Sequence, residues 1–189
     1  VSYWFAGAGH GGYGGQYHDF HQTADDYYDG GEPYGDPYQP TTLGSGGGIG
    51  SAGGGAIHLA VSDTLILNGT ISANGKGGSV YQWSGRGGGA GGSIWIESRV
   101  ITGSGTIQAN GGESEYHNFS GKGGGGAGGR IAVYAETDDF SSQEDRIQSR
   151  GATSEYGGSR GGHTGGPGTI YLGELGEVVH DKELRVDNG

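Results

Sequence analysis

Apolar residues alternate with polar or small residues in four stretches of this chain, and glycine-rich segments separate the stretches. The first reads AIHLAV at residues 56–61, with Ile57, Leu59 and Val61 at alternate positions. In such an alternating pattern every second side chain lies on the same face, as a half-buried β-strand requires. The same pattern returns as SIWIES at 93–98, RIAVYAE at 130–136 and TIYLGE at 169–174. These stretches predict four strands.

A shorter strand pattern follows each of the four. It reads GTISANG at 69–75, GTIQANG at 105–111, DRIQSRG at 145–151 and LRVDNG at 184–189. The first-strand anchors are 37, 37 and 39 residues apart, and the second-strand anchors are 36, 40 and 39 apart. These anchors are Ile57, Ile94, Ile131 and Ile170, and then Ile71, Ile107, Ile147 and Val186. Two ladders with nearly one period indicate an internal repeat.

The repeat predicts an all-β fold, because one unit cannot bury its apolar stripe without a neighbour. We expect a parallel β-helix or a solenoid-like β-sandwich of four repeats of about 37 residues, joined by glycine-rich loops that pack in the manner of polyglycine II. The expected repeats are 53–89, 90–126, 127–165 and 166–189, within one structural unit. An antiparallel sandwich is the alternative, in which each Asn-Gly pair forms a type I′ hairpin turn.

Residues 1–52 form an acidic N-terminal region rich in tyrosine, proline and glycine. Pro33, Pro37 and Pro40 exclude a helix there and favour turns and extended segments. We expect this region to be a long ordered loop that packs on the repeat domain. Loops of that length are commonly functional when they are ordered.

The chain is unusually rich in glycine and poor in hydrophobic residues. Glycine supplies 49 of the 189 residues, against a typical share of roughly 7%. Hydrophobic residues make up only 31%, so a thick conventional core is not expected. Glycine in such numbers indicates close packing of backbones or positive φ angles.

Charge narrows the choice of partner. The formal net charge is −11 and the sequence pI is about 4.8, which argues against a nucleic-acid partner because phosphates require clustered lysine and arginine. No apolar run of about 18 residues is present, so membrane insertion is not expected. The chain contains no cysteine and starts at Val1, and this start suggests a processed mature protein or an excerpt.

Several segments together resemble a glycine-rich repeat found in large secreted or cell-surface proteins of bacteria and eukaryotes. They are GHGGYGG at 9–15, YGDPYQPTTLGSGGG at 34–48, NGTISANG at 68–75 and GGGAGGSIWI at 87–96. The resemblance covers most of residues 7–135. It implies an extracellular or cell-surface location and an adhesin-like or matrix-like role, and it supplies no catalytic residues.

The acidic cluster of the N-terminal region could bind Ca²⁺, a cation that takes six to eight oxygen ligands and suits carboxylate-rich turns. The spacing matches neither an EF-hand nor the nonapeptide calcium repeat. A solvated acidic loop is the alternative. The candidate ligands are Asp25, Asp26, Asp29, Glu32 and Asp36.

Aromatic residues recur in corresponding loops about one repeat apart, at Tyr81, Trp83, Tyr116, Phe119 and Tyr156. Stacking of the repeats would align them in a row that contacts a subunit or a sugar ring. They could equally fold down over the thin glycine-rich surface.

Two N-glycosylation sequons begin at Asn68 and Asn118. They are informative only in a secreted eukaryotic protein. Asn118 lies in an expected loop and is the better acceptor, whereas Asn68 also fits a turn.

No motif indicates catalysis, so we do not expect an enzyme. Strand patterns at both termini, Val1–Phe5 and Leu184–Asn188, suggest uncapped ends, and uncapped ends favour head-to-tail association. The leading hypothesis is an extracellular structural subunit that assembles with itself into a surface fibre or matrix filament. The second is a carbohydrate-binding or adhesin module, and the third is a polysaccharide-acting enzyme.

Overall fold

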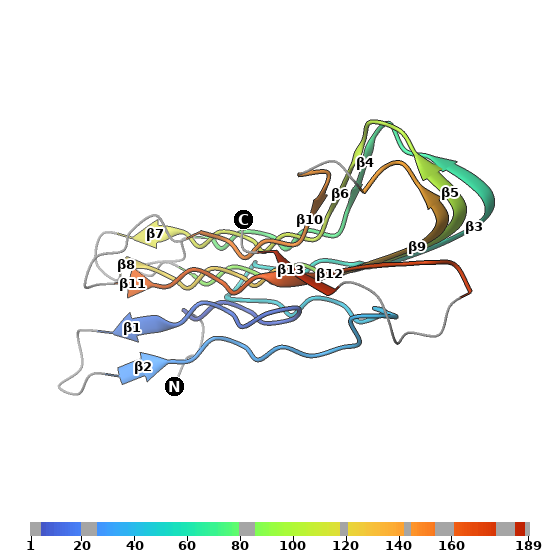
Figure 1. Cartoon of the computed structure of the whole chain (residues 1–189). Helices are drawn as coiled ribbons and strands as arrows, with labels where there is room; N and C mark the ends of the chain where they lie inside the picture. Colours follow the sequence, from blue (N-terminus) through green and yellow to red (C-terminus); the bar gives the residue numbers. More distant parts are fainter. Residues whose placement is uncertain are drawn as a thin grey trace.

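The computed structural model describes residues 5–19, 26–79, 86–117, 121–141, 145–153, 161–176 and 184–187. Two sheets form the sides of an arch, and extended glycine-rich segments run away from the arch as a long bundle (Figure 1). The described residues contain strands and no helix.

The larger sheet collects the first strand of each repeat. Its strands lie in the order β13-β12-β9-β5-β3, and all neighbours are parallel except β12 and β13. Ile57, Ile94, Ile131 and Ile170 are paired in register, so the ladder predicted from the spacing is present. The strands are β3 (Ala56–Ile66), β5 (Ser93–Thr102), β9 (Arg130–Asp138), β12 (Gly168–Gly173) and β13 (Leu184–Asp187).

The smaller sheet collects the second strands of three repeats. β4 (Thr70–Ser72), β6 (Thr106–Gln108) and β10 (Ile147–Gln148) are parallel, with Ile71, Ile107 and Ile147 in register. The fourth member expected here was Val186, and that prediction is wrong. Val186 lies in β13, which turns back and pairs antiparallel with β12.

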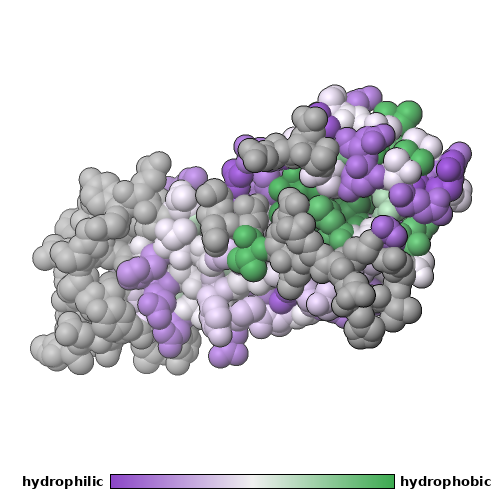
Figure 2. Space-filling model, viewed as in Figure 1, coloured by the Kyte–Doolittle hydropathy of each residue, from purple (hydrophilic) through white to green (hydrophobic). Residues whose placement is uncertain are grey.

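The hydrophobic core lies between these two sheets, and Figure 2 shows apolar colour gathered over them and largely pale colour over the bundle. Inward-facing isoleucines of both sheets form its centre, and Phe140 closes it from the segment after β9. The largest fully buried members are Ile94, Ile96, Ile101, Ile107, Ile131 and Phe140.

The bundle is held by backbone hydrogen bonds with a period of three residues. In residues 124–129, Gly124 and Ala127 donate to Phe5 and Ala8, Gly125 and Gly128 to His163 and Gly166, and Gly126 and Gly129 to Gly112 and Ala109. Each third residue thus faces the same neighbour. Three residues per turn is the geometry of polyproline II, a helix without internal hydrogen bonds.

This packing requires glycine because the segments touch backbone to backbone. A Cβ added to Gly88 would lie 1.8 Å from the carbonyl oxygen of Gly112, and one added to Gly126 would lie 2.0 Å from that of Gly89. The bundle has room for methyl groups where three alanines contact one another. Ala8, Ala90 and Ala127 form a small buried cluster inside the bundle.

Short antiparallel pairings lie toward the end of the bundle away from the arch (Figure 1). β1 (Tyr17–Asp19) lies between β2 (Asp26–Tyr28) and β11 (Gly161–Gly162). β7 (Tyr116–His117) pairs with β8 (Gly121–Lys122). The β7–β8 hairpin of the second repeat and β11 of the third repeat therefore lie at the same end of the molecule.

The predicted parallel β-helix or solenoid-like β-sandwich is wrong. The first three repeats each contribute one long and one short strand to two parallel sheets, and β12 of the fourth repeat brings the long strands to four against three short ones. Among the described residues, no strand closes these sheets into a coil. The physical reason is glycine: the segments between strands run out and back as bundle elements and do not turn a corner to a further strand. The antiparallel alternative is also wrong, because β3 pairs with β5 and β4 with β6.

Candidate interaction surface

Both parallel sheets end at the first repeat. β3 is the edge strand of the larger sheet and β4 is an edge strand of the smaller one. Among the described residues, no strand pairs with the outer edge of either. An unpaired edge offers N–H and C=O groups to another polypeptide. We call β3 and β4 together the open end.

The hydrophobic core is less covered at the open end than one repeat further in. Four apolar residues on the strands of the first repeat are only partly buried, whereas their register partners in the second repeat are fully buried. The pairs are Ile57–Ile94, Leu59–Ile96, Leu65–Ile101 and Ile71–Ile107. A neighbour on the outer side accounts for the difference, since the second repeat has one and the first does not.

The backbone of β3 shows which groups the open end presents. The Ser93 N–H donates to the Gly55 carbonyl at 3.0 Å. Because backbone groups alternate in direction along a strand, those of Ala56, His58 and Ala60 point away from β5.

Gly55 gives independent evidence for this exposure. A Cβ added to its counterpart Gly92 would lie 1.9 Å from the Gly55 carbonyl oxygen. No described atom lies within 4 Å of a Cβ added to Gly55 itself. The same position is thus crowded in the second repeat and accessible in the first.

A register irregularity between Val61 and Thr64 limits the regular part of the edge. Within it, Asp63 forms an exposed ion pair with Arg99 of β5. Bulges and charges at an edge discourage pairing. The stretch available for regular pairing is therefore residues 56–61.

The side chain of His58 is held on the outer face of the sheet, which leaves the backbone beside it accessible. Its ring stacks on Trp95, with centroids 4.0 Å apart and planes 9° apart. Its Nε2 lies 2.9 Å from Oε2 of Glu97. Both partners belong to β5, so they fix this side chain from within the molecule.

Asparagine side chains connect successive repeats beside the smaller sheet. Asn74 Oδ1 accepts the Asn110 N–H at 2.8 Å, and Asn110 Oδ1 accepts the Arg150 N–H at 2.9 Å. Asn68 Oδ1 accepts the Ser104 N–H at 3.1 Å in the same manner. Each repeat thus supplies an acceptor to a backbone donor of the next.

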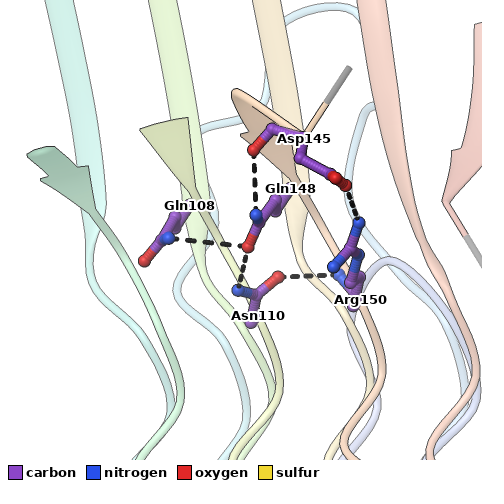
Figure 3. A network of polar contacts seen from close by, with 5 residues as sticks. All are labelled: Gln108, Asn110, Asp145, Gln148 and Arg150. Atoms are coloured by element: carbon purple, nitrogen blue, oxygen red, sulfur yellow. Dashed lines mark hydrogen bonds and ion pairs between the residues drawn. The ribbon is translucent and has the colours of Figure 1, made fainter. Parts of the chain in front are cut away.

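This ladder ends differently at the other side of the stack (Figure 3). Arg150 stands where an asparagine would continue it, and its guanidinium forms an ion pair with Asp145. Gln148 Nε2 donates to the Asp145 carbonyl at 2.8 Å, and Gln148 Oε1 accepts from Asn110 at 3.2 Å. The arginine side chain has no hydrogen-bond acceptor. At this end it therefore cannot accept a backbone N–H from a further repeat.

His10 links the N-terminal glycine-rich segment to two other segments, one of them just before β5. It is fully buried, and its Nδ1 lies 2.7 Å from the Gly91 carbonyl oxygen while Nε2 lies 2.8 Å from Thr42 Oγ1. A carbonyl only accepts, so Nδ1–H donates and Nε2 accepts from the threonine hydroxyl. Tyr34 packs on the ring, with centroids 4.8 Å apart.

Residues 34–42 cross the starts of the central strands on the outer face. Arg130 Nε donates to the Tyr34 carbonyl at 2.8 Å, and Tyr134 Oη donates to the Tyr38 carbonyl at 2.9 Å. Burial lowers the pKa of Arg130 and raises the pKa of Tyr134 to about 12. The tyrosine therefore remains a hydrogen-bond donor at neutral pH.

We expect the protein to lose stability on mild acidification through His10. Burial lowers the pKa of His10 below its ordinary value of 6.5, and Arg130 lowers it further. The unfolded chain therefore binds this proton more readily. Stability is complete above pH 6.5 and falls as the pH drops from there through the folded-state pKa. Thermal melts between pH 5 and 8 measure the effect.

His10→Gln tests this prediction by removing the imidazole. It should lower the melting temperature at pH 8 and flatten its decrease toward pH 5. A wild-type melting temperature that is constant across this range would contradict the assignment.

The predicted acidic Ca²⁺ ligands are only partly described. Asp25 and the side chain of Asp26 lie outside the described residues. Asp29 Oδ1 accepts from Gln16 Nε2 at 2.8 Å, and Asp36 Oδ1 accepts the Tyr38 N–H at 2.8 Å within a turn. These contacts give both carboxylates a structural role.

Asp29 and Glu32 line a cleft of about 420 Å³ beside His163 and the exposed Tyr13. In the part of the chain that the structure describes, no group of three or more His, Asp or Glu side chains could hold a metal ion. The Ca²⁺ site therefore stays a prediction.

The remaining predicted sites lie mostly outside the described residues. Asn118 and four of the aromatic residues belong to undescribed segments, and Tyr116 begins β7 without a described side chain. The four undescribed aromatic residues are Tyr81, Trp83, Phe119 and Tyr156. Asn68, the other predicted glycosylation site, is exposed in the turn before β4.

Comparison with known proteins gives no match for this chain, whether among family models, curated proteins or solved structures. No helix among the described residues has the length and apolarity to span a membrane. The resemblance to glycine-rich surface proteins therefore stays a prediction.

Two features of this structure could not be predicted from the sequence. Asn74 and Asn110 have the pattern of turn residues before glycine, and only the pairing of repeats shows that they form a ladder. His10 interrupts a glycine run, and a lone imidazole among glycines was the signal that it fills a specific space.

Proposed function

We propose that this chain is a structural protein that assembles by pairing the open end with a β-strand of another polypeptide. The observation that carries the proposal is the burial difference between the first and second repeats at equivalent core positions. Covering partly exposed aliphatic side chains stabilises an assembly by roughly 25 cal/mol for each Å² removed from water.

The glycine bundle supports a structural rather than catalytic role. Its segments are joined by backbone hydrogen bonds in three directions, and added Cβ atoms at most described glycine positions would collide with neighbouring backbone. Such packing leaves little internal freedom. We propose that the bundle acts as a rigid body that holds the arch and the returning hairpins at opposite ends.

The test is to block the outer edge of β3 without touching its bond to β5. The N–H of Ala60 points outward, so Ala60→Pro removes a donor that the isolated fold does not use. We expect the wild type to associate as its concentration rises, and Ala60→Pro to remain monomeric, in light scattering after size exclusion. A monomeric wild type throughout would overturn the proposal.

Ala60→Ser is the matched control, because serine keeps the backbone donor at the same position. It should associate as the wild type does. Equal association by the proline and serine variants would show that the contact lies elsewhere, provided that their melting temperatures agree.

A further inference from the structure

We infer that the partner at the open end is a second copy of this chain, paired antiparallel through β3 about a twofold axis. The inference rests on the proposed function and adds the identity and geometry of the partner. An interface of this kind uses the same patch on both copies and closes after two.

Head-to-tail stacking is disfavoured because the two ends of the stack do not match. β13 runs antiparallel along β12, so a further copy would meet a reversed strand of four residues in place of a parallel one. Beside β10, Arg150 occupies the ladder position and donates to Asp145. It offers no side-chain acceptor for the outward N–H of Asn74 in the next copy.

The edge of β3, in contrast, is complementary to itself. Opposite residues of an antiparallel pair share one face of the sheet, so pairing must join odd positions with odd ones to keep the core continuous. A twofold axis at Leu59 meets this condition. It places Leu59 opposite Leu59 of the second copy and Ile57 opposite Val61 of the second copy.

The hydrogen bonds agree with this register. Ala56, His58 and Ala60 carry the outward groups, so His58 and Ala60 of the two copies would form hydrogen-bonded pairs on either side of the axis. A register centred on His58 would instead place Val61 opposite Gly55, which has no side chain to cover it. Leu59 is therefore the preferred centre.

Pairing about Leu59 also uses the regular edge. Residues 57–61 are the central positions of this register, and they lie before the irregularity that starts after Val61. The partly buried Ile57 and Leu59 would gain a neighbour on their open side, as Ile94 and Ile96 already have. The association thus covers the core positions that the single chain leaves least protected.

Single cysteines test the geometry, because the natural chain contains none. Across a non-hydrogen-bonded antiparallel pair the Cα atoms lie about 4.5 Å apart, within the range of a disulfide. Leu59→Cys should shift to a covalent dimer on mild oxidation. Ile57→Cys alone should remain monomeric, and its mixture with Val61→Cys should form the dimer.

Val186→Cys, which is exposed on β13, is the control at the other end and should stay monomeric. Dimers formed only by mixing Leu59→Cys with Val186→Cys would establish head-to-tail contact and overturn the twofold pairing. Association by light scattering without any cross-link through position 59 would overturn it as well. If the wild type does not associate at all, the proposed function itself is contradicted.

Discussion

Gly92→Ala is expected to destabilise the protein by about 3 kcal/mol or more, which corresponds to a melting temperature lower by at least about 6 °C. The new methyl carbon would lie 1.9 Å from the Gly55 carbonyl oxygen and 2.6 Å from the Gly54 carbonyl carbon. Both are backbone atoms, so no side chain can rotate away. Relief requires separating two segments, and Gly92 itself donates to Ala73 in a neighbouring segment.

Gly55→Ala is the matched control, because Gly55 holds the same place in the first repeat. Its added Cβ meets no described atom within 4 Å, and its φ lies outside the left-handed region. We expect a change within about 0.5 kcal/mol, or a small gain from a less flexible unfolded chain. Thermal and urea melts of both variants measure the contrast, and equal losses would contradict backbone crowding as the cause.

The strands of this fold could be predicted from the sequence because alternation reports burial directly. Ile57, Ile94 and Ile131 occupy one ladder, as their spacing predicts. The path between strands could not be predicted. A glycine run has no side-chain period, so it does not indicate whether the chain turns a corner or runs out and back.

The different character of the two ends was also beyond the sequence. Val186 lies at the repeat spacing, yet it belongs to a reversed strand on the larger sheet. Four residues of alternating pattern are compatible with either direction. Arg150 likewise takes the place of an asparagine in an otherwise ordinary repeat, and its meaning depends on Asp145 across the turn.

The sequence predicted that strand edges would be unpaired, but it did not predict which strands form them. The terminal strand patterns suggested uncapped ends, and β3 and β4 lie at sheet edges where no described strand pairs with them. They belong to residues 56–72, however, whereas the prediction placed the first end at Val1–Phe5. Residues 1–4 lie outside the described residues, and residues 5–16 take part in the bundle. Identifying the exposed repeat required knowledge of which segments pack as strands.

Ile131→Ala should cost about 2–5 kcal/mol, because Ile131 is fully buried with a register partner on either side. Ile57→Ala should cost less in dilute solution, because Ile57 has a neighbour on one side only. Paired open ends would bury Ile57 further, and a folded state that associates gains stability with concentration. The loss from Ile57→Ala should then grow with concentration, while that from Ile131→Ala stays constant.

Melts at low and high protein concentration measure both losses. Ala60→Pro provides the reference, since a chain that cannot pair should show one small, constant loss on adding Ile57→Ala. A loss at position 57 that equals the loss at position 131 under every condition would contradict the difference in burial. If the stability lost through Ile57→Ala in the wild-type background does not depend on protein concentration, the burial of Ile57 by association is contradicted. The same pair of substitutions thus reports separately on the fold of one chain and on the contact between two.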